Sequence, residues 1–382
     1  MWKLWSFGLV VLGMSVTFSR SADGQDAAVV SSIGFSSISV EAQSQLHTQQ
    51  VFGSDATALL NKVYAEARRV GGTPVKLHVV AVDSSTVEAL GTALAARKSM
   101  EKPVVTCVVG KLADAQAKLG IDAVIRVSPA KRTAAKGDGV QSSVEARVID
   151  DGFGRVLTPG SRLYISGQAE KGTTPAEAAR LTMESLKRTL EWLDSSLDDI
   201  VQAKAFLTPI ASADEVRAEF AKFVGHRKIP LVLVEWSSTL PIEIELVAAT
   251  PTPAIGADAV EYLTPPGMTA SPVYCRVARV NAPETIYIGG LVAPKAESAD
   301  QEVRQLFGEL QNILVSSRSD LQHLVKATYY VVSPEASAQL NALRPQFYEA
   351  SRPPAASKAV VAGIGRADCN LTMDMIAVRS RK

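Results

Sequence analysis

The sequence has little of what marks several common classes of protein. Its three cysteines (Cys107, Cys275 and Cys369) are an odd number without a CxxC pair, which excludes a disulfide scaffold and favours buried thiols, although one bridge stays open. Its four histidines are scattered, so no metal site is expected, and no cofactor motif is present. Basic residues number 40 and acidic residues 39, without a tail or stripe of one sign. This balance argues against nucleic-acid binding, which depends on neutralising phosphates.

An isolated long hydrophobic run occurs at the N-terminus. Lys3 precedes an apolar run of twelve residues, Phe7 to Phe18, and small residues follow up to Ala22. Twelve residues span only about 18 Å as a helix, less than the bilayer core of about 30 Å. The order therefore predicts a signal peptide over residues 1–22, with export to the periplasm or the extracellular medium and no membrane association after cleavage. An uncleaved anchor stays the alternative.

What the sequence does contain is an internal repeat. The strand-like segment Leu163–Gln168 has counterparts at Leu46–Val51 and Ile286–Leu291, at offsets of 117 and 123 residues. Each segment is followed by an amphipathic helix, a strand, a second helix and two closing strands. The first helix is clearest after Thr174, where Pro175 suits the first helical position and Glu177 predicts a capping box. Three modules of about 110 residues are therefore expected.

Each module reads as α+β, a mixed sheet with its helices on one face. The predicted repeats cover residues 27–129, 142–249 and 271–382, and the first has diverged most. A polar, basic linker over 130–141 separates the first two repeats, and a proline-rich, exposed linker over 250–270 separates the last two.

The second repeat carries a resemblance to a known family. In order along the chain it contains Ile165–Gln168, the helix, the step Ser196–Val201 and the segment Leu240–Glu245. The third repeat keeps Tyr274, Gly289 and Gly290. This ordered set resembles the Rid family, the reactive intermediate deaminases of the RidA or YjgF type that are also described as endoribonuclease L-PSP-like.

The resemblance implies a chorismate-mutase-like fold and clefts at subunit junctions. Family members are trimers, so three fused repeats imply one chain that closes as a monomeric pseudo-trimer. Active members bind the substrate carboxylate through an arginine, but the matching positions here are Val105, Leu231 and Ala356. The water-positioning glutamate matches Glu243 in the second repeat and Thr372 in the third; in the first repeat it falls on Ile121 or Asp122.

Glu243 is therefore the candidate catalytic residue. Glu243 and Glu245 alternate with isoleucines, a spacing that by itself favours a solvated strand face, whereas the family match favours a cleft. Arg227, Arg352 and Arg366 lie near closing strands and are candidates to replace the missing arginine. The candidate ligand-binding residues are Phe153, Ser166, Gly167, Leu231, Tyr274 and Gly289.

Three functions stay open at this stage. The first is an exported protein that binds a small metabolite in degenerate Rid-type clefts without efficient deaminase activity. The second is a hydrolase, an enamine or imine deaminase that uses Glu243 and a relocated cation. The third is a structural array that pairs with protein partners. A cation such as Arg227 or Arg276 that faces Glu243 across a repeat junction would favour the second.

Overall fold

The computed structural model describes residues 18–19, 30–31, 36–97, 102–128, 146–253 and 257–380. The predicted linker over 130–141 lies outside these residues, and so does the predicted signal peptide apart from Phe18 and Ser19. Among the described helices, none is both long and apolar enough to cross a membrane. The three cysteines are free and buried, which confirms the expected thiols.

The helices and strands follow the predicted order in each repeat. The first repeat contains β3 (Ser37–Glu41), β4 (Ser44–Thr48), β5 (Val51–Gly53), α1 (Ala56–Arg69), β6 (Gly72–Ala81), α2 (Ser84–Ala95), β7 (Val104–Val109) and β8 (Leu119–Val127). The second contains β9 (Val148–Asp151), β10 (Gly154–Leu157), β11 (Arg162–Gln168), α3 (Pro175–Trp192), β12 (Ile200–Leu207), α4 (Ala213–Val224), β13 (Leu231–Glu235) and β14 (Ile242–Ala249). The third contains β15 (Val260–Leu263), β16 (Val277–Val280), β17 (Glu284–Val292), α5 (Ala299–Ser316), β18 (Leu324–Val331), α6 (Pro334–Leu343), β19 (Ala355–Val360), β20 (Gly363–Ile364) and β21 (Leu371–Ala377).

The α+β fold class is confirmed, and the local signals explain the helix starts. Thr174 caps α3 by accepting a hydrogen bond from the Glu177 backbone N–H at 3.1 Å. The carboxylate of Glu177 accepts from the N–H and hydroxyl of Thr173 rather than from Thr174, so the predicted capping box is shifted by one residue. The predicted linker over 250–270 contains a strand, β15, which pairs with β16.

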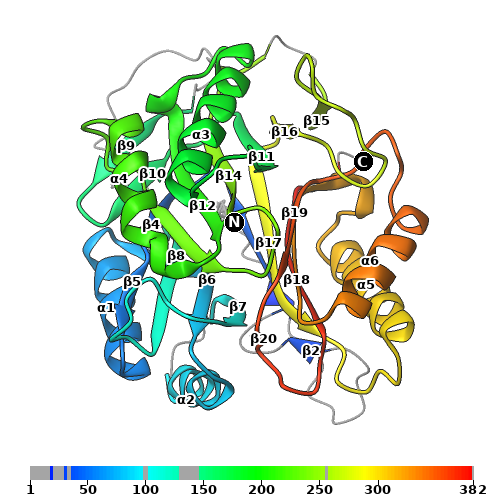
Figure 1. The fold of residues 1–382 in the computed structure, drawn as a ribbon. Coiled ribbons are helices and arrows are strands. Elements are labelled where there is room, and N and C mark those ends of the chain that lie inside the picture. Colours follow the sequence, from blue (N-terminus) through cyan, green and yellow to red (C-terminus); the bar gives the residue numbers. More distant parts are fainter. Residues whose placement is uncertain are drawn as a thin grey trace, which may run out of the picture.

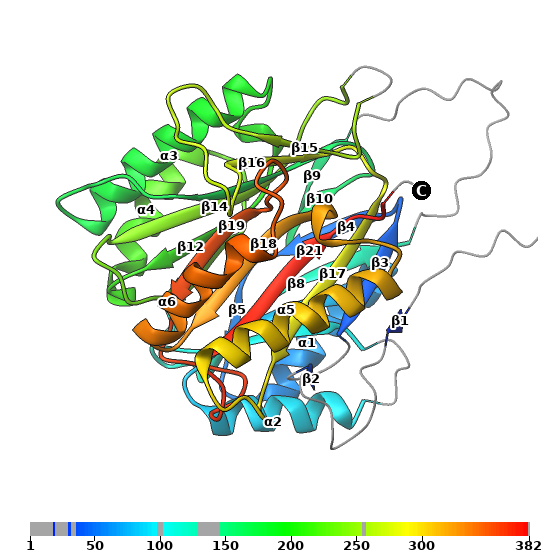
Figure 2. The same ribbon diagram turned by 90° about the vertical axis from the view of Figure 1, so that its right-hand side faces the viewer.

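Each repeat builds one mixed sheet that carries two helices. In each sheet a parallel pair (β6 with β7, β12 with β13, β18 with β19) lies beside antiparallel strands, because a helix crosses over between the two parallel strands. Each sheet packs its two helices in a separate apolar core. The helices lie on the outside of the molecule and the three sheets face its centre (Figure 1; Figure 2).

The sheets exchange strands in a closed cycle. The hairpin β9–β10 of the second repeat pairs with β4 in the first sheet, and β15–β16 of the third repeat pairs with β11 in the second sheet. The strand β3 of the first repeat pairs with β17 in the third sheet. The first strands of each repeat thus extend the sheet of another repeat, which links each sheet to the next by backbone hydrogen bonds.

Candidate functional site

The candidate site lies where the second and third repeats meet. Glu243 stands on β14, opposite Phe206 of β12. On its other side β11 leaves regular register between Ile165 and Gln168, a bulge that contains Ser166 and Gly167. A Cβ at Gly167 would lie 1.9 Å from Glu243 Oε1, so only glycine permits this approach. The bulge and Glu243 are therefore packed directly against each other.

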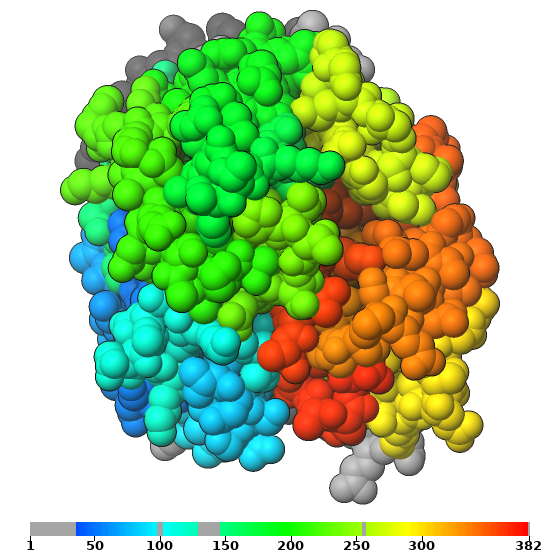
Figure 3. Space-filling view, viewed as in Figure 1, coloured from blue at the N-terminus to red at the C-terminus, as the bar shows by residue number. Residues whose placement is uncertain are grey.

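The third repeat supplies the opposite wall. Gly167 N–H donates to Ser357 Oγ on β19 at 3.2 Å. Ser166 N–H donates to the carbonyl of Arg276, just before β16, at 2.9 Å. The space-filling view shows a hollow between the green and yellow-green segments of the second repeat and the yellow and orange segments of the third (Figure 3). Two segments of the third repeat thus border the bulge that packs against Glu243.

The surroundings of Glu243 change its acidity. Burial, together with the nearby carboxylate of Glu245, raises the pKa of Glu243 to about 7. A hydrogen bond from Ser357 and the charges of Lys326 and Arg276 act in the opposite direction. No cation among the described residues forms an ion pair with Glu243, so burial prevails and the side chain titrates near neutrality.

The three arginines expected near the closing strands do not pair with Glu243. Arg227 binds Asp198 at 2.5 Å, Arg366 binds Asp368 at 2.8 Å, and Arg352 lies over the ring of Tyr262. The cation that borders the site is Arg276, whose guanidinium lies 5.1 Å from the centre of the Tyr274 ring. Of the two arginines expected to approach Glu243 across a repeat junction, Arg276 therefore borders the site and Arg227 does not.

The remaining predicted residues are divided among different junctions. Phe153 belongs to the hairpin that joins the first sheet, and it packs against the core of the first repeat. Leu231 begins β13 and packs against the core of the second repeat. The candidate ligand-binding residues Phe153 and Leu231 therefore do not lie beside Glu243. The strand exchange is the physical reason, since it moves each hairpin to another sheet.

The other two junctions are filled. Register places Gly120 and Thr372 at the positions equivalent to Glu243, which corrects the alignment with Ile121 or Asp122. At the first junction the Gln50 amide bonds both the N–H and the carbonyl of Leu233, and Phe52 covers Gly120. At the third, Thr106 Oγ1 would lie 2.9 Å from a Cβ at Gly289. Gly289 therefore lies away from Glu243, and the second junction alone retains a carboxylate at this position.

Comparison with known proteins agrees with this architecture. The family model described as Endoribonuclease L-PSP matches residues 148–250 and 269–379, which are the second and third repeats. The matches cover more than half of the sequence, and the chain belongs to this family, the Rid or YjgF family. No curated protein matches the chain.

Several solved structures are similar to parts of the chain. An uncharacterized protein from Pseudomonas aeruginosa is 26% identical over 25% of this chain and 84% of its own, with a TM-score of 0.24. Yeast Mmf1 is 24% identical over 32% of this chain and 98% of its own, with a TM-score of 0.24. Rv2704 of Mycobacterium tuberculosis, a member of the YjgF/YER057c/UK114 family, is 22% identical over 25% of this chain and 83% of its own, with a TM-score of 0.23.

Proposed function

We propose that the protein is an exported, monomeric Rid-family protein that binds a small metabolite between its second and third repeats, without efficient deaminase activity. The observation that carries the proposal is the half-buried carboxyl group of Glu243, which has no ion-pair partner among the described residues and lies beside the bulge at Gly167. A largely desolvated carboxylate without a counter-ion favours a ligand that donates hydrogen bonds or carries positive charge.

The replaced arginine supports binding without turnover. Ala356 stands beside Ser357 on β19, where the family's arginine would hold a substrate carboxylate. A charge-assisted hydrogen bond contributes roughly 1.5–3 kcal/mol, and the desolvation of an unpaired carboxylate would add to the loss. Two of the three junctions are also closed by packed contacts, which Gln50 makes at the first junction and Thr106 at the third.

The test of binding is calorimetric titration of the purified chain with ethanolamine, a cationic probe, and with propionamide, a neutral one. We expect saturable binding, with the Glu243→Gln variant weakening ethanolamine at least tenfold and propionamide less. The exposed pair Lys187–Glu191 provides the control variant Glu191→Gln, which keeps wild-type affinity. Equal affinities in wild type and Glu243→Gln would contradict the proposed site.

One observation favours an enamine or imine hydrolase as the second candidate. Arg276 brings positive charge to Glu243 from a different backbone position than the family's arginine. In that reaction water adds to the carbon of the C=N bond and ammonia leaves, with Glu243 positioning the water and Arg276 holding the substrate carboxylate. Release of ammonia from 2-iminopropionate decides between the two. We expect no detectable turnover; turnover that both Arg276→Gln and Glu243→Gln abolish would establish the hydrolase instead.

A further inference from the structure

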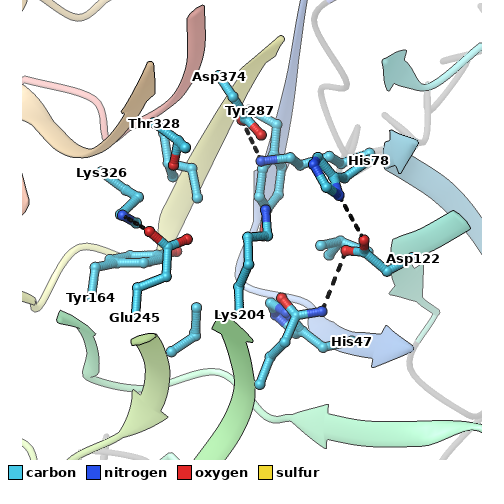
Figure 4. Close-up of a pocket in the computed structure, with 15 residues that line it drawn as sticks. His47, His78, Asp122, Tyr164, Lys204, Glu245, Tyr287, Lys326, Thr328 and Asp374 are labelled. Carbon is cyan, nitrogen blue, oxygen red and sulfur yellow. Dashed lines mark hydrogen bonds and ion pairs between the residues drawn. The ribbon is translucent and has the colours of Figure 1, made fainter. Parts of the chain in front are cut away.

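A second polar site lies at the centre of the molecule, where the three sheets face one another. It is a chamber of about 40 Å³, separate from the junction at Glu243. Each repeat contributes five side chains from equivalent register positions (Figure 4). The lining residues are His47, Lys76, His78, Asp122 and Val124 of the first repeat, Tyr164, Gln202, Lys204, Glu245 and Val247 of the second, and Tyr287, Lys326, Thr328, Asp374 and Ile376 of the third.

Ionic contacts in the chamber join one repeat to another. Lys326 of β18 donates to Glu245 of β14 at 2.5 Å, and Lys76 of β6 donates to Asp374 of β21. At the third equivalent position Gln202 replaces the lysine, and its amide lies 3.5 Å from Asp122 Oδ2. The other oxygen of Asp122 lies 2.8 Å from His78 Nδ1. Asp122 is therefore held by neutral hydrogen-bond donors and not by a lysine.

Lys204 is the third lysine of the chamber, besides the ion-paired Lys76 and Lys326. No carboxylate among the described residues lies within ion-pair distance of Lys204, although Asp122, Glu245 and Asp374 all act on its charge. Its side chain enters the chamber between Glu245 and Asp122 (Figure 4). Lys204 itself is buried. A buried ammonium group without a direct acceptor requires one from an occupant of the chamber.

Among the side chains that line the chamber, unused hydrogen-bond donors outnumber unused acceptors. Lys76 and Lys326 each donate one hydrogen bond to a carboxylate, whereas Lys204 donates none to a carboxylate of the described residues. His47, whose imidazole is neutral, adds one ring N–H donor and one acceptor nitrogen, both buried without a hydrogen bond. Against these donors stands one unpartnered carboxylate oxygen, Oδ2 of Asp374. An occupant that mainly accepts hydrogen bonds fits this lining better than one that donates and accepts equally.

The chamber also limits the size of its occupant. About 40 Å³ corresponds to about three water molecules, at roughly 10–15 Å³ each. Apolar clusters shared by the three sheets flank the polar layer, with Val80, Phe206 and Tyr330 on one side and Ile38 and Val325 in the other cluster. An organic metabolite of ordinary size does not fit between them.

We propose that the central chamber binds one small inorganic anion of halide or nitrate size, held by Lys204 with His47 beside it. Three lysines and three carboxylates already balance in charge, so an added anion favours the uptake of one proton. His47 is the group placed to take it. The charged and polar groups that face His47 are Lys76, Asp122, Arg162 and Gln202, from four different strands.

The titration of His47 gives the proposed binding a pH dependence. Burial, with the charges of Lys76 and Arg162, lowers the pKa of His47 to about 4, against the opposing effects of Gln202 and Asp122. A bound anion would raise this pKa, because it stabilises the protonated imidazole. Anion binding and protonation of His47 therefore favour each other, and the affinity for the anion rises as the pH falls.

The first experiment compares the thermal unfolding of the whole chain in sodium bromide and in sodium gluconate at one ionic strength. Gluconate is too large for the chamber, so a saturable rise of the midpoint with bromide alone is expected. Lys204→Gln should remove this rise, and the exposed Lys187→Gln should keep it. Identical midpoints of the wild type in the two salts would overturn the proposal.

The second experiment uses the wild type alone, so its outcome does not depend on whether a variant folds. Crystals of the wild type grown in sodium bromide should show anomalous scattering in the chamber within hydrogen-bond distance of Lys204 Nζ. Nuclear magnetic resonance of labelled histidines should show the His47 pKa rising when bromide replaces gluconate. Water without anomalous signal and an unchanged His47 pKa would mean that the chamber holds solvent alone, and the proposal would be wrong.

Discussion

Ile38 of β3 pairs with Tyr287 of β17, so a strand near the start of the described chain completes the sheet of the last repeat. Both residues are almost completely buried, in a cluster to which all three repeats contribute. The hairpins β9–β10 and β15–β16 make the equivalent connections between the other sheets. The cycle of strand exchange therefore closes within one chain.

This closure predicts the state of assembly. Because each sheet receives its additional strands from the same chain, no second copy is required, and the mature protein should be a monomer. Light scattering coupled to size-exclusion chromatography gives the mass directly. A stable species of three chains would contradict the prediction.

The closing strand should stabilise the whole molecule. Ile38→Ala removes a buried side chain shared by the three sheets, and we expect the free energy of unfolding to fall by about 2–5 kcal/mol. Urea denaturation measures the change. The matched control is Ile149→Ala on β9, where the side chain is 54% exposed and the loss should stay below about 0.5 kcal/mol.

Gly167 should be intolerant of even one added methyl group. In Gly167→Ala the Cβ would meet the carboxylate of Glu243, so that side chain or the bulge has to move, at a cost of about 1–3 kcal/mol. The affinity for a ligand at the junction should decrease as well. Gly152→Ala is the control, because nothing lies within 4 Å of an added Cβ there. Equal stability and binding in the two variants would show that the contact is not important.

The raised pKa of Glu243 predicts a dependence of stability on pH. Its folded pKa of about 7 lies above the ordinary value of 4.5, so the protonated form is favoured by folding. The contribution of this group is fully present below pH 4.5 and is lost as the pH rises through 7, by at most about 3 kcal/mol. The wild type should therefore lose stability relative to Glu243→Gln over this interval. Parallel pH profiles of the two proteins would contradict the assignment.

The buried thiols should be unreactive in the folded protein. Burial raises the pKa of Cys107 and Cys275 to about 12, which leaves almost no thiolate at neutral pH. A thiol reagent such as dithionitrobenzoate should therefore label these two cysteines only after denaturation. Labelling of the native chain at the rate of a free thiol would show that the core opens locally.

Much of the architecture could be predicted from local sequence patterns. The α3 start at Thr174 and Pro175 depends on caps a few residues apart, and the order of helices and strands depends on apolar periodicity. Glu243 could be named as the candidate catalytic residue because the ordered family motif surrounds it. The strand exchange could not be predicted in the same way, because a hairpin such as β9–β10 has the same alternation whichever sheet receives it.

The sequence by itself determined the three repeats, the α+β class, the loss of the arginine at Ala356 and the retention of Glu243, because residue identity and short-range spacing carry these features. Only the tertiary structure decided which residues surround Glu243: Ser357 and Arg276 of the next repeat, and not Phe153 or Leu231. It also decided that Glu245 meets Lys326 in a central chamber. These contacts join positions from 81 to 190 residues apart. They depend on how the sheets close around one another, which no local pattern encodes.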